Sequence, residues 1–157
     1  MGRVILIKKF LVSPLPILSD FHDTEKLQPL GKRFVSYGLD INILDGVPVK
    51  IEEIAAKRKF AGKKTIDINK LEITYLPSGL STRGRRNKFY EQPDFMALLS
   101  IGSAPRDIHI YEKNGTSLAK LNPGDLLLIS EYDFSIPADL AEKKETTILI
   151  YKGIFAA

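Results

Sequence analysis

Short apolar segments rich in β-branched residues recur along the chain and are separated by turn sequences. This pattern is typical of buried strands, because a helix needs a longer stretch in which apolar residues recur every three or four positions. The five clearest segments are Arg3–Val12, Phe34–Leu44, Phe95–Gly102, Leu126–Tyr132 and Thr146–Phe155. The segment Lys64–Pro77 alternates in part and predicts one or two further strands with a kink near Asn69. The chain is therefore expected to be mainly β.

Two turns support an antiparallel arrangement. Asn114-Gly115 stands between two extended segments, and this pair favours the positive φ angles of a tight hairpin turn. The sequence Asn-Pro-Gly-Asp at 122–125 predicts a second turn before the apolar run that begins at Leu126. The polar stretch Ser19–Arg33 contains Pro29 and Gly31, and we expect it to be a long loop.

Helices are few. Val49–Gly62 is the best candidate, since Ile51, Ile54 and Ala55 share one face and Gly62 can end the helix. A second short helix is expected around Pro137. No linker divides the chain, so we predict one domain over residues 1–157. Its expected fold is an open or closed barrel of about seven strands, largely antiparallel, with two short helices.

The sequence has no cysteine, no apolar run long enough to cross a membrane and no recognisable signal peptide at its start. We therefore expect a cytoplasmic protein without a membrane partner.

No catalytic site is evident in the sequence. There are two histidines, His22 in a polar loop and His109 in a strand, where alternation places it opposite Ile108 and Ile110. The Pro-Gly-Asp turn is similar to that of cupins, but the paired histidines that bind metal in cupins are missing. The Glu-x-Lys pattern at 142–144 falls in an expected helix, not in the strand that a magnesium-dependent nuclease would need. We predict no catalytic residue, no metal and no cofactor in this domain.

Positive charge is concentrated in the middle of the chain. Residues 47–90 carry eleven Lys or Arg against four Asp or Glu, and residues 112–157 carry five against seven. The densest part is the segment Gly79–Phe95, a long connection between two expected strands. Arginine pairs well with phosphates and guanine edges, and the neutral Ser, Thr and Asn side chains of the segment can donate hydrogen bonds to phosphate oxygens. The candidate DNA-binding residues of this segment are Ser81, Thr82, Arg83, Arg85, Arg86, Asn87 and Lys88.

The stretch from Lys70 to Ile101, followed by the turn and strand at 121–129, resembles the DNA-binding pseudobarrel of plant transcription factors and of EcoRII-type restriction endonuclease recognition domains. In that family two arms at one end of the barrel grip the major groove. The resemblance implies that the fold is an open seven-stranded pseudobarrel, largely antiparallel, with two short helices, and that the basic segment forms one arm. It also implies a second arm within Ser19–Arg33, with Lys26, Lys32 and Arg33.

The resemblance implies sequence-specific binding of double-stranded DNA, as the recognition module of a restriction system, with a nuclease domain or subunit as a further partner. Whether the protein is an enzyme stays open, although this domain is not expected to be catalytic by itself. Two alternatives remain: a jelly-roll or barrel protein with a structural or assembly role, and a metal-free cupin-like enzyme. The cupin-like alternative needs His109 as a base in a closed pocket.

Overall fold

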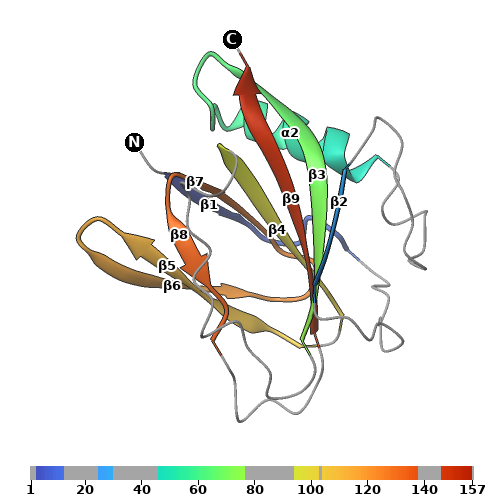
Figure 1. Ribbon diagram of the computed structural model, residues 1–157, viewed down its shortest axis with the longest axis vertical. Helices are drawn as coiled ribbons and strands as arrows, with labels where there is room; N and C mark the ends of the chain where they lie inside the picture. The colour runs from blue at the N-terminus through green and yellow to red at the C-terminus, as the bar shows by residue number, and fades with distance from the viewer. Residues whose placement is uncertain are drawn as a thin grey trace.

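The fold consists of two antiparallel β-sheets and one helix (Figure 1). The computed structural model describes residues 3–12, 25–29, 46–76, 94–102, 104–137 and 146–156. The large sheet has the strand order β1 (Arg3–Ile7), β7 (Leu126–Ser130), β4 (Phe95–Gly102), β9 (Thr146–Ala156), β3 (Thr65–Leu76) and β2 (Glu25–Pro29). The small sheet has the order β6 (Gly115–Leu121), β5 (Arg106–Glu112) and β8 (Asp133–Ser135). The helix is α2 (Val47–Lys57).

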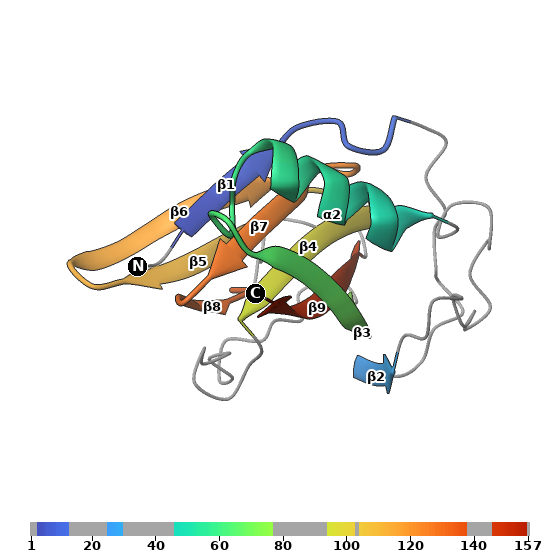
Figure 2. The same ribbon diagram turned by 90° about the horizontal axis from the view of Figure 1, so that it is seen from above.

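The elements form three layers. Helix α2 lies across one face of the large sheet (Figure 2), and we call this face the outer face. The small sheet packs against the opposite face, which we call the inner face. Because side chains alternate along a strand, each strand of the large sheet contributes to both faces.

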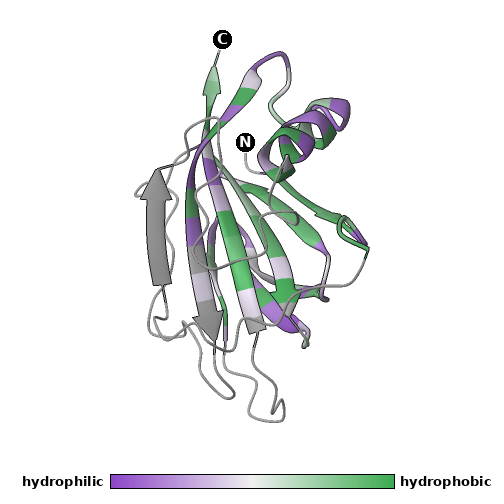
Figure 3. Ribbon diagram, turned by 90° about the vertical axis from the view of Figure 1, so that its right-hand side faces the viewer, coloured by the Kyte–Doolittle hydropathy of each residue, from purple (hydrophilic) through white to green (hydrophobic). Residues whose placement is uncertain are grey.

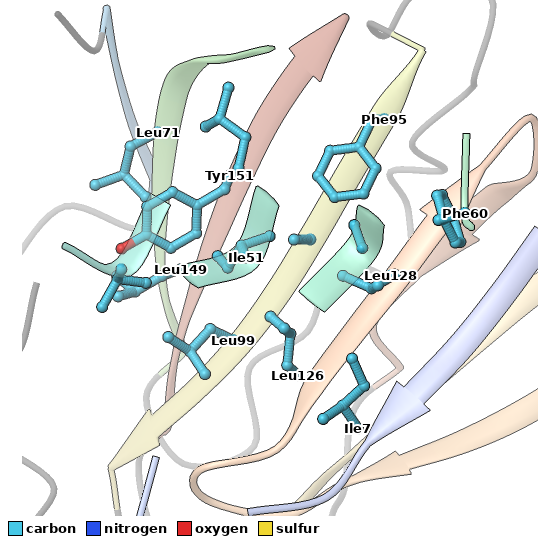
Figure 4. Close-up of a cluster of buried hydrophobic side chains, with 14 of the residues drawn as sticks. Ile7, Ile51, Phe60, Leu71, Phe95, Leu99, Leu126, Leu128, Leu149 and Tyr151 are labelled. Atoms are coloured by element: carbon cyan, nitrogen blue, oxygen red, sulfur yellow. The ribbon is translucent and has the colours of Figure 1, made fainter. Parts of the chain in front are cut away.

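The outer face carries a continuous apolar core beneath α2. Ile51 and Ala55 of the helix are fully buried against it, and Figure 4 shows Ile51 among the side chains of the central strands. Phe60 and Phe95 meet edge to face, with ring centroids 5.5 Å apart. In Figure 3 the helix is coloured as hydrophilic on one side and hydrophobic on the other. The apolar side faces the sheet and accounts for the burial of α2.

The inner face forms a second apolar core with the small sheet. From the large sheet this core includes Leu98 of β4, Leu127 of β7 and Ile150 of β9. Ile108 and Ile110 of β5 pack against them from the small sheet. Adjacent residues of one strand therefore belong to different cores, as the alternation of a sheet buried on both faces requires.

Helix α2 begins earlier and ends earlier than the predicted span. Gly46 has φ 76° and precedes Val47 and Pro48, which form the first turn, where proline is well tolerated. The helix ends at Lys57, because the chain then turns through Lys59 and Gly62, both with positive φ. The buried stripe of Val47, Ile51 and Ala55 has the expected helical spacing.

Strand β3 is irregular close to the predicted kink. Its pairing with β9 shifts between Ile68 and Lys70, which is the signature of a β-bulge. At this point the backbone of β3 comes very close to Gly153 of β9. A Cβ atom on Gly153 would lie 2.5 Å from the carbonyl oxygen of Asp67, so only glycine fits here.

The turn at 122–125 joins the two sheets to the N-terminal segment. Asp125 is buried, and its carboxylate accepts hydrogen bonds from the backbone N–H groups of Lys9 (3.0 Å) and Asn122 (3.1 Å). The backbone of Gly124 adds bonds to Ser100 and Leu11. The aspartate therefore fixes the end of β1 against the turn that precedes β7.

The mainly β, antiparallel fold is confirmed, and so is the hairpin at Asn114-Gly115, which joins β5 to β6. The seven-stranded pseudobarrel is wrong, because the described residues form two facing sheets of six and three strands. Part of the expected loop at 19–33 is the edge strand β2, where Pro29 ends the pairing with β3. The expected strand at 34–44 and most of the second helix lie outside the described residues. The single-domain assignment stays a prediction.

None of the helical residues that the structure describes forms a segment long and apolar enough to cross a membrane.

Candidate functional site

The inner face of the large sheet carries buried polar residues on the neighbouring strands β4, β9 and β3. Residues paired across neighbouring strands point to the same face, so the register identifies the inner-face residues of β3 and β4. Ile150 of β9 is paired with Glu72 on one side and Leu98 on the other. Ile148 is paired with Thr74 and Ser100. Glu72, Thr74 and Ser100 therefore lie on the same face as the apolar inner core.

Lys152 of β9 forms an ion pair with Glu72 on this face. It lies two residues beyond Ile150, so its side chain also points inward. Its Nζ is 3.4 Å from Oε1 of Glu72, and the two side chains are 9% and 7% exposed. Removing two charges from water costs several kcal/mol per ion. The attraction within a well-formed ion pair only just offsets this cost. A buried pair with one contact is therefore weak support for stability.

Two hydroxyl groups on the same face have no hydrogen-bond partner among the residues that the structure describes. Thr74 is 1% exposed and Ser100 is 0% exposed, and neither Oγ atom makes a hydrogen bond. An unsatisfied buried polar group costs about 1–3 kcal/mol, so such groups are uncommon unless something else binds them. We call Glu72, Thr74, Ser100 and Lys152 the inner polar cluster.

The cluster offers complementary hydrogen-bonding groups. The Lys152 ammonium has three N–H donors, the Glu72 carboxylate has only acceptors, and the hydroxyls of Thr74 and Ser100 can do both. Glu72 and Thr74 are two residues apart on β3, roughly 6.6 Å along the strand. The four side chains come from three neighbouring strands, β4, β9 and β3, and apolar residues of β4 and β9 lie beside them.

Tyr151 carries a buried polar group on the outer face and differs from the inner polar cluster in its surroundings. Its hydroxyl is buried, and no hydrogen-bond partner for it is found within the described ranges of the chain. Figure 4 shows the ring between Leu71 and Leu149, in the apolar core under α2. Burial raises the pKa of Tyr151 well above its ordinary value, because the charged phenolate would be desolvated. With only apolar neighbours in that cluster, this hydroxyl does not form a site.

The predicted DNA-binding residues are not brought together by anything the structure describes. Lys26 lies in β2 opposite Ile73, and its side chain falls outside the described part. The other candidate DNA-binding residues lie outside the described residues: Lys32, Arg33, Ser81, Thr82, Arg83, Arg85, Arg86, Asn87 and Lys88. Their contacts stay predictions.

His109 lies where strand alternation predicts. Its neighbours Ile108 and Ile110 belong to the inner core, so His109 occupies the opposite face of β5 and is only partly buried. It is paired with Leu118 of β6 and Ser135 of β8. The prediction that His109 would be the base in a closed cupin-like pocket is therefore wrong. His22 lies outside the described residues.

Sequence reasoning missed the inner polar cluster. A signal was present, since Thr74 and Lys152 interrupt segments that are otherwise apolar or alternating. Assigning them to the interior required the pairing of β3, β4 and β9, which are far apart in the chain. Among the described residues, no three His, Cys, Asp or Glu side chains gather in a way that could hold a metal ion.

No protein-family model matches the chain, and no curated protein matches it in sequence. Solved structures do match in shape. A prolyl-4-hydroxylase from Pseudomonas putida superposes with a TM-score of 0.59 at 11% identity, covering 96% of this chain and 92% of the hydroxylase. An oxidoreductase of the 2OG-Fe(II) oxygenase family from Burkholderia pseudomallei gives 0.58 at 12% identity, covering 85% and 71%. The protein OsALKBH1 gives 0.53 at 9% identity, covering 95% and 97%.

These likenesses overturn the resemblance to the DNA-binding pseudobarrel. The predicted function, sequence-specific DNA recognition for a restriction system, depended on that fold and is corrected with it. At 9–12% identity the comparisons carry the fold and nothing further. In fold, the cupin-like alternative, which is also a jelly roll, agrees better with these likenesses and with the two facing sheets than the pseudobarrel does. In fold, this chain is similar to 2OG-Fe(II) oxygenases.

Proposed function

We propose that this protein binds a small carboxylate-bearing molecule at the inner polar cluster, with the ligand carboxylate against Lys152. The observation that carries the proposal is the concentration of four buried polar side chains on one face that is otherwise apolar. Two of them, Thr74 and Ser100, have hydroxyls that no group in the described part of the chain satisfies. A bound molecule would form hydrogen bonds to these groups and so offset the free-energy cost of their desolvation, which folding alone leaves uncompensated.

The structural neighbours support the class of ligand. One of them is described as a 2OG-Fe(II) oxygenase, and 2OG, 2-oxoglutarate, is a small dicarboxylate. A buried lysine on the interior face of such a fold is suited to a carboxylate, because an ammonium group desolvated by the protein attracts an anion strongly. Only the ligand class, a small carboxylate, is carried over to this chain.

The iron of those oxygenases does not fit the residues present here. Non-haem Fe(II) oxygenases hold the metal with two histidines and one carboxylate that meet in the interior. This sequence has two histidines in all, and one of them, His109, lies on the face of β5 opposite the inner core. A two-histidine interior site therefore cannot form with this arrangement, and oxygenase chemistry is not part of the proposal.

Calorimetric titration of the full chain tests the proposal. The ligands are succinate, pyruvate, 2-oxoglutarate, L-alanine and L-glutamate. We expect at least one to bind with one-to-one stoichiometry, and we expect Thr74→Val/Ser100→Ala to weaken that binding by tenfold or more, about 1.4 kcal/mol. The matched control is Thr116→Val, which removes an exposed hydroxyl from β6 and should leave the affinity unchanged. Equal affinity in the double variant and the control would contradict the proposal.

A further inference from the structure

Strand β6 forms one edge of the small sheet. In the described part of the chain it is paired with β5 on one side and with no strand on the other. The hairpin of β5 and β6 projects from the rest of the fold (Figure 1). At the centre of β6 lies Leu118, whose side chain is 62% exposed. An edge strand with an exposed apolar residue can act as a template for pairing with another chain.

The register of the hairpin identifies the backbone groups of β6 that point away from the sheet. Glu112 and Gly115 are partners on either side of the two-residue turn, so they exchange hydrogen bonds with each other. Hydrogen-bonded pairs alternate along an antiparallel ladder, so every second residue of β6 from Gly115 onward bonds to β5. The N–H and C=O groups of the residues between them point outward, and we call Thr116, Leu118 and Lys120 the edge residues. No hydrogen bond to their backbone groups is found among the described residues.

We propose that β6 pairs antiparallel with β6 of a second copy of this chain, with the two Leu118 residues opposite each other. A two-fold axis then passes between them, and the two small sheets join into one continuous sheet. Thr116 of each copy lies opposite Lys120 of the other, so each outward N–H group meets an outward C=O group. This pairing satisfies the edge residues of both copies, and it is independent of the proposed function.

The positions of the edge residues determine the register. With Leu118 at the centre, the edge residues of one copy are all opposite edge residues of the other. Any shift that keeps the outward groups facing each other places at least one edge residue opposite Asn114 or Asn122, which lie outside the strand. Such a shift leaves outward backbone groups without a partner, so the register centred on Leu118 makes the most hydrogen bonds.

The side chains agree with this register. The exposed side chains of the two Leu118 residues lie next to each other on one face of the joined sheet and bury apolar surface. Lys120 lies opposite the neutral Thr116 of the other copy, and its partner on β5 is Asp107. No like charges are therefore directly opposite each other, an arrangement that would be destabilising. Because the interface is a single strand from each copy, it is small, and we expect a dimer that dissociates on dilution.

Sedimentation velocity of the full chain tests the proposal. Between about 5 and 500 µM the unmodified protein should change from mainly monomer towards dimer. Leu118→Lys places two ammonium groups beside the two-fold axis and should weaken association by about tenfold or more. The matched control is Val49→Lys, which introduces the same charge at an apolar residue of α2 that is 55% exposed, and it should leave association unchanged. A protein that stays monomeric over this range, or equal association of the two variants, overturns the proposal.

Amide hydrogen exchange measured by NMR at low and high protein concentration locates the contact. The amides of Thr116, Leu118 and Lys120 should exchange more slowly in proportion to the fraction of dimer, because each gains a hydrogen bond. The amides of Ser117 and Ala119 already bond to β5 and should change little. A dimer without this alternating pattern would be joined through another surface and would also overturn the proposal.

Discussion

The two faces of the large sheet are buried to a similar degree but differ in chemistry. The outer face, under α2, is filled by apolar side chains from one edge strand, β1, across to β3. The inner face is apolar on β1 and β7, is interrupted by Ser100 on β4 and Lys152 on β9, and carries Glu72 and Thr74 on β3. The same strands therefore carry a mainly apolar core on one side, with Ser130 and Thr147 towards the strand ends, and a polar cluster that includes an ion pair on the other.

This difference indicates which face serves stability and which serves function. An apolar residue at Glu72 or Thr74 would stabilise the fold without the cost of burying a charge or an unsatisfied hydroxyl. The outer face shows that the chain fills such positions with apolar residues, as at Leu71 and Leu149. Polar groups retained together on the inner face are therefore best explained by a ligand. The outer face also buries the hydroxyl-bearing side chains of Ser130, Thr147 and Tyr151, but no ion pair is found there among the described residues.

The largest effect is expected from breaking the ion pair of the inner face. Lys152→Met leaves the Glu72 carboxylate buried without its partner, which should lower the free energy of unfolding by about 3–5 kcal/mol. Lys152→Met/Glu72→Leu removes both charges and should recover most of this loss. Urea denaturation followed by circular dichroism measures both variants. A double variant as unstable as the single one would show that the pair itself stabilises the fold.

Two neighbouring leucines allow the roles of the two faces to be tested separately. Leu98 points to the inner face and Leu99 to the outer face, and both are fully buried. Each Leu→Ala change should lower the free energy of unfolding by about 2–5 kcal/mol, because it leaves a cavity. Only Leu98→Ala should also alter ligand affinity, since Leu98 lies in register with Ile150 and Glu72. Equal effects of both variants on affinity would remove the functional distinction between the faces.

A smaller loss is expected at Gly153. Gly153→Ala places a Cβ 2.5 Å from the backbone oxygen of Asp67, so the bulge in β3 must shift. Strain of this kind typically costs about 1–3 kcal/mol. Thermal unfolding monitored by circular dichroism should show a lower midpoint than for Gly115→Ala, where a Cβ meets no atom within 4 Å and only the positive φ is unfavourable. The reverse order would contradict the close approach of β3 and β9.

The smallest effect is expected at Tyr151, and with the opposite sign. Tyr151→Phe removes a buried hydroxyl that has no partner, so stability should be unchanged or higher by up to about 1 kcal/mol. The raised pKa of Tyr151 adds a pH dependence. Above pH 10 the unfolded chain loses the phenol proton and the folded chain keeps it, so the free energy of unfolding should fall by about 1.4 kcal/mol per pH unit.

This fall should be absent below pH 10 and should be smaller in Tyr151→Phe than in the unmodified protein, as urea denaturation at pH 9, 10 and 11 would show. An identical pH dependence in the two proteins would place the Tyr151 hydroxyl in contact with solvent.

Local elements of the fold could be predicted from the sequence. The strand from Phe95 to Gly102, the hairpin at Asn114-Gly115 and the irregularity near Asn69 agree with the structure. These features depend on turn residues and short-range alternation, which a single sequence displays. The functional prediction relied on the basic segment for the same reason, because a cluster of charges can be recognised without any knowledge of the fold.

The candidate site could not be predicted in the same way. Glu72 and Lys152 are separated by 80 positions, and only the pairing of β3 with β9 brings them together. The face on which Thr74 and Ser100 lie follows from the register, and a shift of one residue would have moved each of them to the outer face. Strand order and register are properties of the assembled sheet, so the site appears only once the fold is known.

Methyl NMR tests the central claim most directly, because isoleucines report on both faces. Ile148 and Ile150 lie on the inner face between the members of the inner polar cluster, and Ile51 and Ile101 belong to the outer core. On titration with L-glutamate or L-alanine, the account predicts saturable shifts of the Ile148 and Ile150 methyl signals and unchanged signals for Ile51 and Ile101. Shifts confined to the outer-face isoleucines, or no shifts with any carboxylate, would contradict it.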